Sequence, residues 1–237
     1  MMQTAVYSRI GDLEIKVDFQ APPSVKEGVL PSIVFIHGGG MIAGCCQAAT
    51  SAHRKGMVFL SADHRLIHPS TGLDIIEDMR TLFAFLSHPS FSTKHLPDGI
   101  SLDPARLAVV EASGGGYAAM AAAISDAQPK PKAVFLLYAM GGDFLELCDH
   151  WIAEKGPTAH MGLRHLVDDG AVAHLIDRPL ILDPIAECPL KQRPDGTFGG
   201  GHVGTLRWLI RFRSYQTAEP VLNQLGTDLG WIWAHPS

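Results

Sequence analysis

Ser113 lies between a short apolar segment and a run of glycines, a setting in which a serine hydroxyl can serve as a nucleophile. Leu107–Val110 predicts a buried strand, and the alanine-rich residues 118–124 predict a helix. A sharp turn between them would set the hydroxyl at a helix N-terminus, where backbone N–H groups favour negative charge. Such a turn needs small neighbours, and Gly115 supplies one two positions after the serine. Glu111 stands two positions before the serine, where the G-x-S-x-G turn motif has glycine. We expect its side chain to crowd the turn or tilt outward.

A second glycine cluster, His37-Gly38-Gly39-Gly40, follows the apolar segment Ile33–Ile36. Glycines let a backbone come close enough to point N–H donors at a developing oxyanion, and losing one such donor typically costs about 10²–10³ in rate. The candidate donors are Gly38, Gly39, Gly40 and Gly114. We interpret His37 as a structural residue that fixes this loop. An ordinary strand-to-helix loop at Ser113 is the alternative, but two such motifs in this order, each after a strand, favour a catalytic site.

The composition limits the classes of protein to which the chain can belong. Its 237 residues are 46% hydrophobic and 18% charged, which suits one globular domain or one domain with a cap. The net charge is −5 and no basic run occurs, so we expect no nucleic-acid partner. No apolar run approaches the roughly 20 residues of a spanning helix, and the start lacks a signal-peptide core, so we expect a cytoplasmic protein without a membrane span.

Neither the cysteines nor the histidines predict a metal site or a cofactor. The sequence has 4 Cys and 12 His, none at metal-site spacing, so we expect no metal and no cofactor. We interpret the cysteines as reduced thiols. They are Cys45, Cys46, Cys148 and Cys188.

The periodicity predicts strands that alternate with helices, which implies an α/β fold with a mostly parallel sheet covered on both faces. Active sites of such sheets lie at the carboxyl ends of strands, where both glycine clusters fall. The expected elements are a hairpin of residues 4–10 and 13–19, helices at 47–55 and 73–86, strands at 57–62 and 133–138, and a turn at 103–106 that launches the strand before Ser113. Further helices are expected at 143–154, 162–176 and 206–215.

From about residue 4 to residue 138 the sequence resembles the α/β-hydrolase fold, and within it the hormone-sensitive-lipase-like esterase group. Five motifs carry the resemblance: His37-Gly38-Gly39-Gly40 with Gly44 beyond, Asp63-His64-Arg65-Leu66 where the family usually has Asp-Tyr-Arg-Leu, Glu77-Asp78-Met79-Arg80, Asp103-Pro104-Ala105-Arg106, and Ala112-Ser113-Gly114-Gly115-Gly116-Tyr117. The resemblance implies Ser113 as nucleophile, the loop glycines and Gly114 as oxyanion donors, and a structural role for Asp63, His64 and His68.

The family's catalytic acid and histidine follow the nucleophile in the order Ser, Asp/Glu, His, and their usual settings do not occur here. We therefore expect residues 1–138 to form the hydrolase core, residues 139–237 to form a helical cap-like insertion and C-terminal segment, and the chain to be truncated before the seventh strand. One alternative is a triad of Ser113 with Asp183 and His202. Otherwise Asp183 lies in a plain turn and His202 is solvated. His235 is a less favoured base.

These observations predict a serine hydrolase of the carboxylesterase or lipase type that acts on a small or medium acyl ester through an acyl-enzyme on Ser113. Because a serine hydroxyl without an adjacent base is a weak nucleophile, we expect an incomplete triad to turn over slowly. The expected partner is a small-molecule ester, and the sequence does not fix the oligomeric state. The alternatives are a non-catalytic small-molecule binding protein of the same fold, or a truncated gene product.

Overall fold

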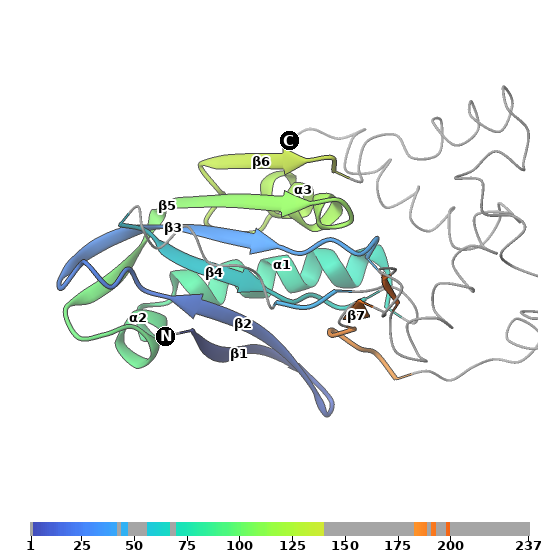
Figure 1. The fold of residues 1–237 in the computed structure, drawn as a ribbon, viewed down its shortest axis with the longest axis horizontal. Coiled ribbons are helices and arrows are strands. Elements are labelled where there is room, and N and C mark those ends of the chain that lie inside the picture. The colour runs from blue at the N-terminus through green and yellow to red at the C-terminus, as the bar shows by residue number, and fades with distance from the viewer. Residues whose placement is uncertain are drawn as a thin grey trace, which may run out of the picture.

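The structure, a computed structural model, describes residues 2–41, 44–46, 56–66, 70–139, 183–188, 191–192 and 198–199. Its main feature is a 6-stranded sheet in the order β1-β2-β4-β3-β5-β6 (Figure 1). The strands are β1 (Gln3–Ile10), β2 (Leu13–Gln20), β3 (Gly28–Ile36), β4 (Val58–Ala62), β5 (Ile100–Ala112) and β6 (Ala133–Leu137). The strands β1, β2 and β4 pair antiparallel, whereas β4, β3, β5 and β6 pair parallel.

The opening hairpin forms as its alternating pattern predicts. β1 and β2 pair from Gln3↔Phe19 to Ile10↔Leu13, and Gly11 makes the turn at φ 58°. The inward side chains of these strands are buried, as period-2 alternation requires. They are Ala5, Tyr7, Ile15, Val17 and Phe19.

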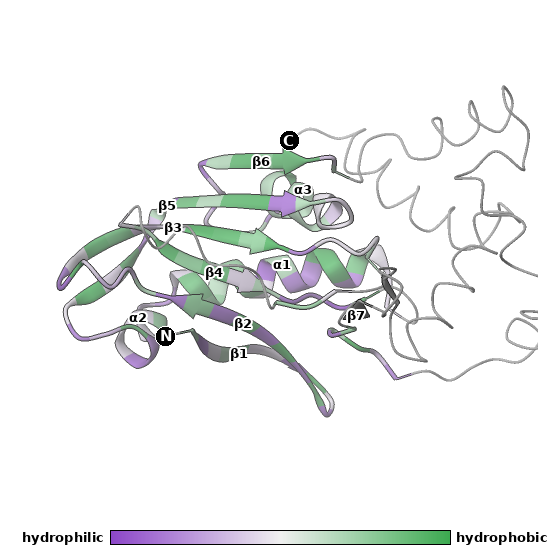
Figure 2. Cartoon of the chain, in the orientation of Figure 1, coloured by the Kyte–Doolittle hydropathy of each residue, from purple (hydrophilic) through white to green (hydrophobic). Residues whose placement is uncertain are grey.

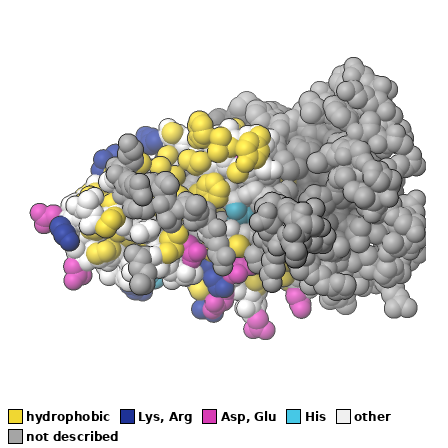
Figure 3. Space-filling view, viewed as in Figure 1, with side chains coloured by type: hydrophobic (Ala, Val, Ile, Leu, Met, Phe, Trp, Pro, Cys, Tyr) yellow, Lys and Arg dark blue, Asp and Glu magenta, His cyan; other side chains and the backbone are white. Residues whose placement is uncertain are grey.

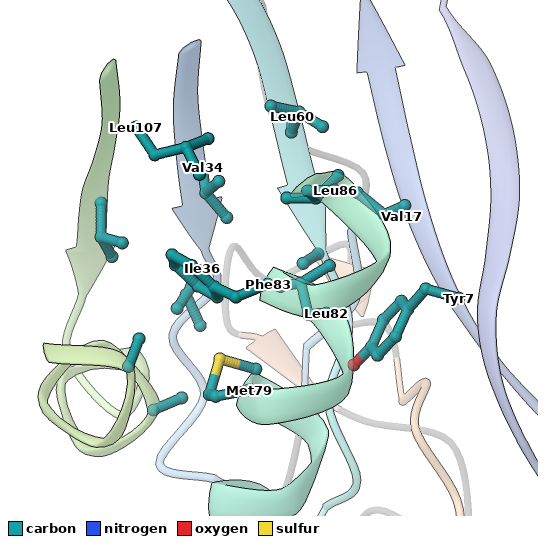
Figure 4. Packing of buried hydrophobic residues seen from close by; sticks show 14 of the residues in the cluster. Tyr7, Val17, Val34, Ile36, Leu60, Met79, Leu82, Phe83, Leu86 and Leu107 are labelled. Atoms are coloured by element: carbon teal, nitrogen blue, oxygen red, sulfur yellow. The ribbon is translucent and has the colours of Figure 1, made fainter. Parts of the chain in front are cut away.

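The helix expected at residues 73–86 is confirmed as α1 (Gly72–Ser87). It begins at a capping box, in which the Thr71 side chain accepts from the Asp74 amide and the Asp74 carboxylate accepts from the Thr71 amide. One face of α1 packs on the sheet, where its apolar side chains meet those of β3, β4 and β5 (Figure 4). The labelled residues of this core include Val34, Ile36, Leu60, Met79, Leu82, Phe83, Leu86 and Leu107.

Two further helices complete the described layer. The helix α2 (Pro89–His95), which the periodicity did not predict, contacts α1 and β5. The helix α3 (Gly115–Ile124) follows β5 and contacts both α1 and β6. The strand β5 therefore leads through α3 to β6, a parallel crossover of the kind that the alternation of strands and helices predicts.

The prediction of a turn at residues 103–106 is wrong in one respect, because these residues lie within β5. Strand pairing runs from Gly28↔Ile100 to Leu30↔Leu102 and resumes at Ser32↔Leu107. The intervening residues form a bulge, inside which the Asp103 carboxylate accepts from the Ala105 amide at 2.9 Å. The local turn chemistry was predicted, and the strand that continues on both sides of it was not.

The sheet order places β3 and β5 next to each other in the parallel part of the sheet, so that their carboxyl ends meet at one edge. A mixed, mostly parallel sheet with a strand–turn–helix after β5 agrees with the α/β fold class that the sequence predicts. Among the described residues, no helix is long and apolar enough to span a membrane.

The helices expected at 47–55, 143–154, 162–176 and 206–215 lie outside the described residues, and so does nearly all of the predicted cap at 139–237. Within that stretch, β7 (Lys191–Gln192) pairs antiparallel with β8 (Phe198–Gly199). The proposed boundary after residue 138 therefore stays a prediction.

Candidate active site

Ser113 occupies the sharp turn between β5 and α3. Its φ is 54°, in the left-handed region, which costs a residue with a side chain roughly 1–2 kcal/mol. Two backbone hydrogen bonds hold it there: the Ser113 amide donates to the Leu137 carbonyl at 3.0 Å, and its carbonyl accepts from the Gly116 amide at 3.1 Å. The residue is partly exposed and directly precedes Gly114, the N-cap of α3.

The two glycine clusters meet backbone to backbone. A Cβ added to Gly38 would lie 2.9 Å from the Ala112 carbonyl oxygen and 3.3 Å from the Ser113 Cβ. A Cβ added to Gly114 would lie 2.5 Å from the Gly40 Cα. Contacts this close leave no room for side chains, so the approach of loop and turn requires glycine at these positions. The structure thus brings Gly38, Gly40 and Gly114 together with Ser113.

Two more glycines shape the same region. Gly39 has φ 104°, a conformation that side-chain-bearing residues rarely adopt. A Cβ added to Gly115 would lie 2.6 Å from the Ile36 carbonyl oxygen, so α3 begins directly against the end of β3. The loop after β3 and the start of α3 therefore pack closely beside the Ser113 turn.

His37 supports this loop from behind. Its ring is buried, and Nδ1–H donates to the Gly38 carbonyl at 2.8 Å. The ring stacks on His64 with centroids 4.8 Å apart. Because Nδ1 carries the proton, Nε2 is the acceptor, and it lies 3.7 Å from Asp63 Oδ1. These contacts agree with a structural role for His37.

Burial sets the protonation of the groups behind the loop. It raises the pKa of Asp63 to about 7 and lowers the pKa of His64 to about 3. It also lowers the pKa of His37. If Asp63 is ionised, its Oδ1 and His37 Nε2 are two hydrogen-bond acceptors that face each other. A protonated Asp63 can instead donate toward His37 Nε2. Below pH 7 the Asp63 carboxyl group is therefore mostly uncharged in the folded protein.

The Asp63-His64-Arg65-Leu66 segment joins the end of β4 to α1. The Arg65 amide and Nε donate to the carboxylate of Asp78, at 2.7 Å and 2.9 Å. Arg65 Nη1 donates to Asp74 Oδ1 at 2.6 Å. Arg65 and Asp78 are both buried, and these contacts agree with the structural role that the resemblance implies. His68 lies outside the described residues.

Glu111 does not tilt outward, and that part of the expectation is wrong. It is fully buried on the face of β5 that also buries Leu107 and Val109. Its Oε1 accepts from the Leu137 amide at 2.7 Å, and burial raises its pKa. The period-2 alternation of Leu107, Val109 and Glu111 was the signal that could have placed it inside.

The pairing of Ser113 with an acid and a base stays a prediction. Asp183 is exposed, two residues before Ile185, whose carbonyl accepts from the Leu66 amide at 2.8 Å. Cys188, in the same segment, exchanges two backbone hydrogen bonds of 2.8 Å with Gly44. Residues 183–188 thus run past the end of β4, whereas His202 and His235 lie outside the described residues. In the described part of the chain, no cluster of His, Cys, Asp or Glu could hold a metal ion.

The sequence matches no protein-family model. Over 147 residues, 58% of this chain, it is 29% identical to the non-reducing polyketide synthase pkbA of Emericella nidulans, and the match covers 6% of that protein. It is 28% identical over 149 residues to the probable carboxylesterase M8 of a Phoma species, with 56% of this chain and 45% of that protein covered. The chain therefore spans less than half of the length of these curated relatives.

Solved structures with a similar arrangement include esterase 2 of Thermogutta terrifontis. The native form aligns with a TM-score of 0.48 and 20% identity, over 59% of this chain and 53% of that one. The propionate-bound form aligns with a TM-score of 0.48 and 19% identity, over 64% and 61%.

Proposed function

We propose that this protein is a serine hydrolase of the carboxylesterase type that cleaves a small or medium acyl ester through an acyl-enzyme on Ser113. One observation carries the proposal: a partly exposed serine at φ 54° lies in a turn whose backbone closely approaches a glycine loop. The similarity to the probable carboxylesterase M8 supports the same class of reaction.

In the proposed reaction, the Ser113 oxygen attacks the ester carbonyl carbon, and the C=O electron pair moves onto the carbonyl oxygen. Amides of Gly39, Gly40 and Gly114 would donate to that oxyanion, with the positive end of the α3 dipole behind them. Collapse of the intermediate expels the alcohol and leaves an ester on Ser113, which water then hydrolyses. The serine proton needs a base, for which Asp183 with His202 remains the proposed pair. Oxyanion stabilisation without a base leaves only about 10³–10⁴ over the rate in water.

Hydrolysis of p-nitrophenyl acetate and butyrate tests the proposal. We expect slow turnover by the wild type and loss of that turnover in Ser113→Ala. Ser125→Ala is the matched control, because Ser125 lies at the other end of α3, where its hydroxyl accepts from the Ala127 amide. Equal hydrolysis by wild type and Ser113→Ala would contradict a nucleophilic role for Ser113.

A second candidate function is a binding protein that keeps the pocket without turnover. The imidazole of His37 lies next to the loop glycines, but its Nδ1 donates to the Gly38 carbonyl and its Nε2 faces Asp63. Because both ring nitrogens face these groups, His37 does not serve as a base for Ser113, which favours binding without turnover. Stabilisation by a non-hydrolysable ester analogue, in a protein that hydrolyses neither test ester, would support binding over catalysis.

A further inference from the structure

A buried carboxyl group ends the strand that leads to Ser113. Leu107, Val109 and Glu111 lie on one face of β5, and each is 0% exposed. Figure 2 shows that the hydrophobic stretch of β5 ends in a hydrophilic segment beside α3. A carboxyl group in such a place is costly unless it makes a hydrogen bond, so its partner indicates what it does there.

The partner of Glu111 is also the partner of the nucleophile. Glu111 Oε1 accepts from the Leu137 amide at 2.7 Å, and the Leu137 carbonyl accepts from the Ser113 amide at 3.0 Å. Leu137 therefore connects the buried carboxyl group to the backbone of Ser113. The second carboxyl oxygen, Oε2, is buried without a hydrogen bond, so the described contacts of the carboxyl group all run through Oε1.

The strand end that carries Leu137 has little burial of its own. Phe135, Leu136 and Leu137 are 60%, 45% and 37% exposed, and hydrophobic side chains gather over this part of the molecule in Figure 3. Ala112↔Leu137 is the last pair between β5 and β6, and Tyr138 follows at φ 43°. Hydrogen bonds to Leu137 are therefore needed to keep its carbonyl where the strained Ser113 turn requires it.

We infer that Glu111 is a positioning residue for Ser113, because its carboxyl group anchors Leu137, whose carbonyl in turn holds the Ser113 amide. This inference rests on the proposed function, since it assumes that Ser113 reacts. Glycine, the usual residue at this position, cannot make the contact. The Glu111 carboxyl group thus holds the Ser113 turn through a hydrogen bond that glycine lacks.

The rate of Ser113 phosphonylation by a fluorophosphonate probe tests the inference without requiring turnover. We expect Glu111→Ala to slow labelling by about 10–100-fold, because a displacement near 1 Å has effects of that size. Glu111→Gln keeps an acceptor for the Leu137 amide and should label within about threefold of wild type. Val109→Ala is the control: it loses buried methyl groups on the same face, two residues earlier, and should lower the melting temperature while labelling at the wild-type rate.

Labelling of Glu111→Ala at the wild-type rate would overturn the inference, and so would slow labelling of Glu111→Gln. If Glu111→Ala does not fold, Glu111→Asp replaces it, since the shorter side chain keeps the carboxyl group but withdraws it from Leu137. Slower labelling of that variant supports the inference, and unchanged labelling overturns it.

Hydrogen exchange separates this inference from the proposed function. If the wild type is not labelled, the proposed function fails, but the anchoring of Leu137 can still be measured. The Ser113 and Leu137 amides should exchange faster in Glu111→Ala, or in Glu111→Asp, than in wild type and Val109→Ala. Unchanged exchange at both amides would show that Glu111 positions nothing.

Discussion

Gly114→Ala tests the close approach between the start of α3 and the glycine loop. Gly114 is the N-cap residue of α3, with φ −63° and ψ −19°, so alanine fits the backbone but caps the helix less well than glycine. The added Cβ would, however, lie 2.5 Å from the Gly40 Cα and 2.6 Å from the Met41 amide nitrogen. Restoring ordinary contact at about 3.5 Å moves the loop by roughly 1 Å.

The clash should lower both stability and rate. Overpacking of this kind costs about 1–3 kcal/mol and the weaker N-cap adds to that cost, so we expect a net loss of stability. A shift near 1 Å of oxyanion donors should lower the rate of Ser113 phosphonylation, and kcat/KM for p-nitrophenyl butyrate, by about 10²-fold.

Gly11→Ala is the matched control for this substitution. Gly11 has φ 58° with open space around it, so alanine there brings backbone strain of about 1–2 kcal/mol without a clash and far from the site. It should lower the melting temperature and leave labelling unchanged. A folded Gly114→Ala protein that labels and hydrolyses at wild-type rates would refute the close approach of the two glycine clusters.

Two other predictions concern the groups behind the loop. Since the pKa of Asp63 rises from 3.8 to about 7 on folding, the folded state keeps a proton that the unfolded state releases, and stability falls as pH rises between those values. The side chain introduced by Asp63→Asn does not titrate, so the unfolding free energy of this variant minus that of wild type should rise by up to about 4 kcal/mol between pH 4 and pH 7. A difference that does not change with pH would contradict this. His64, with its pKa lowered to about 3, favours stability at higher pH in both proteins and cancels from the difference. Arg65→Ala leaves buried Asp78 unpaired and should cost about 3–5 kcal/mol in denaturant unfolding. Arg80, which is 42% exposed, forms an ion pair with Glu77, and Arg80→Ala should cost less than about 1 kcal/mol. Equal losses of stability in the two Arg variants would refute the expected effect of burial.

Local patterns predicted the parts of the fold that local forces decide. The hairpin around Gly11 follows from alternation of apolar side chains, and α1 follows from helical spacing behind the Thr71 cap. The turn at Ser113 was predictable because glycines between an apolar segment and an alanine-rich segment permit a sharp turn. The continuation of β5 through Asp103 was not predictable, because it depends on pairing with β3.

The surroundings of the candidate site needed the order of the strands. His37 and Asp63 are 26 residues apart in number, but Ile36 pairs with Ala62, so each is the next residue after adjacent strand ends. No periodicity within one segment predicts that register. The contact from Glu111 to Leu137 likewise requires β6 to lie beside β5, which only the assembled sheet shows.

The most direct test of the central claim is peptide mapping by mass spectrometry after incubation with a fluorophosphonate. A nucleophilic hydroxyl at the β5–α3 turn predicts a single phosphonyl adduct on Ser113 in the wild type and none in Ser113→Ala. An unmodified Ser113 after prolonged incubation, or the same extent of modification in both proteins, would contradict the account.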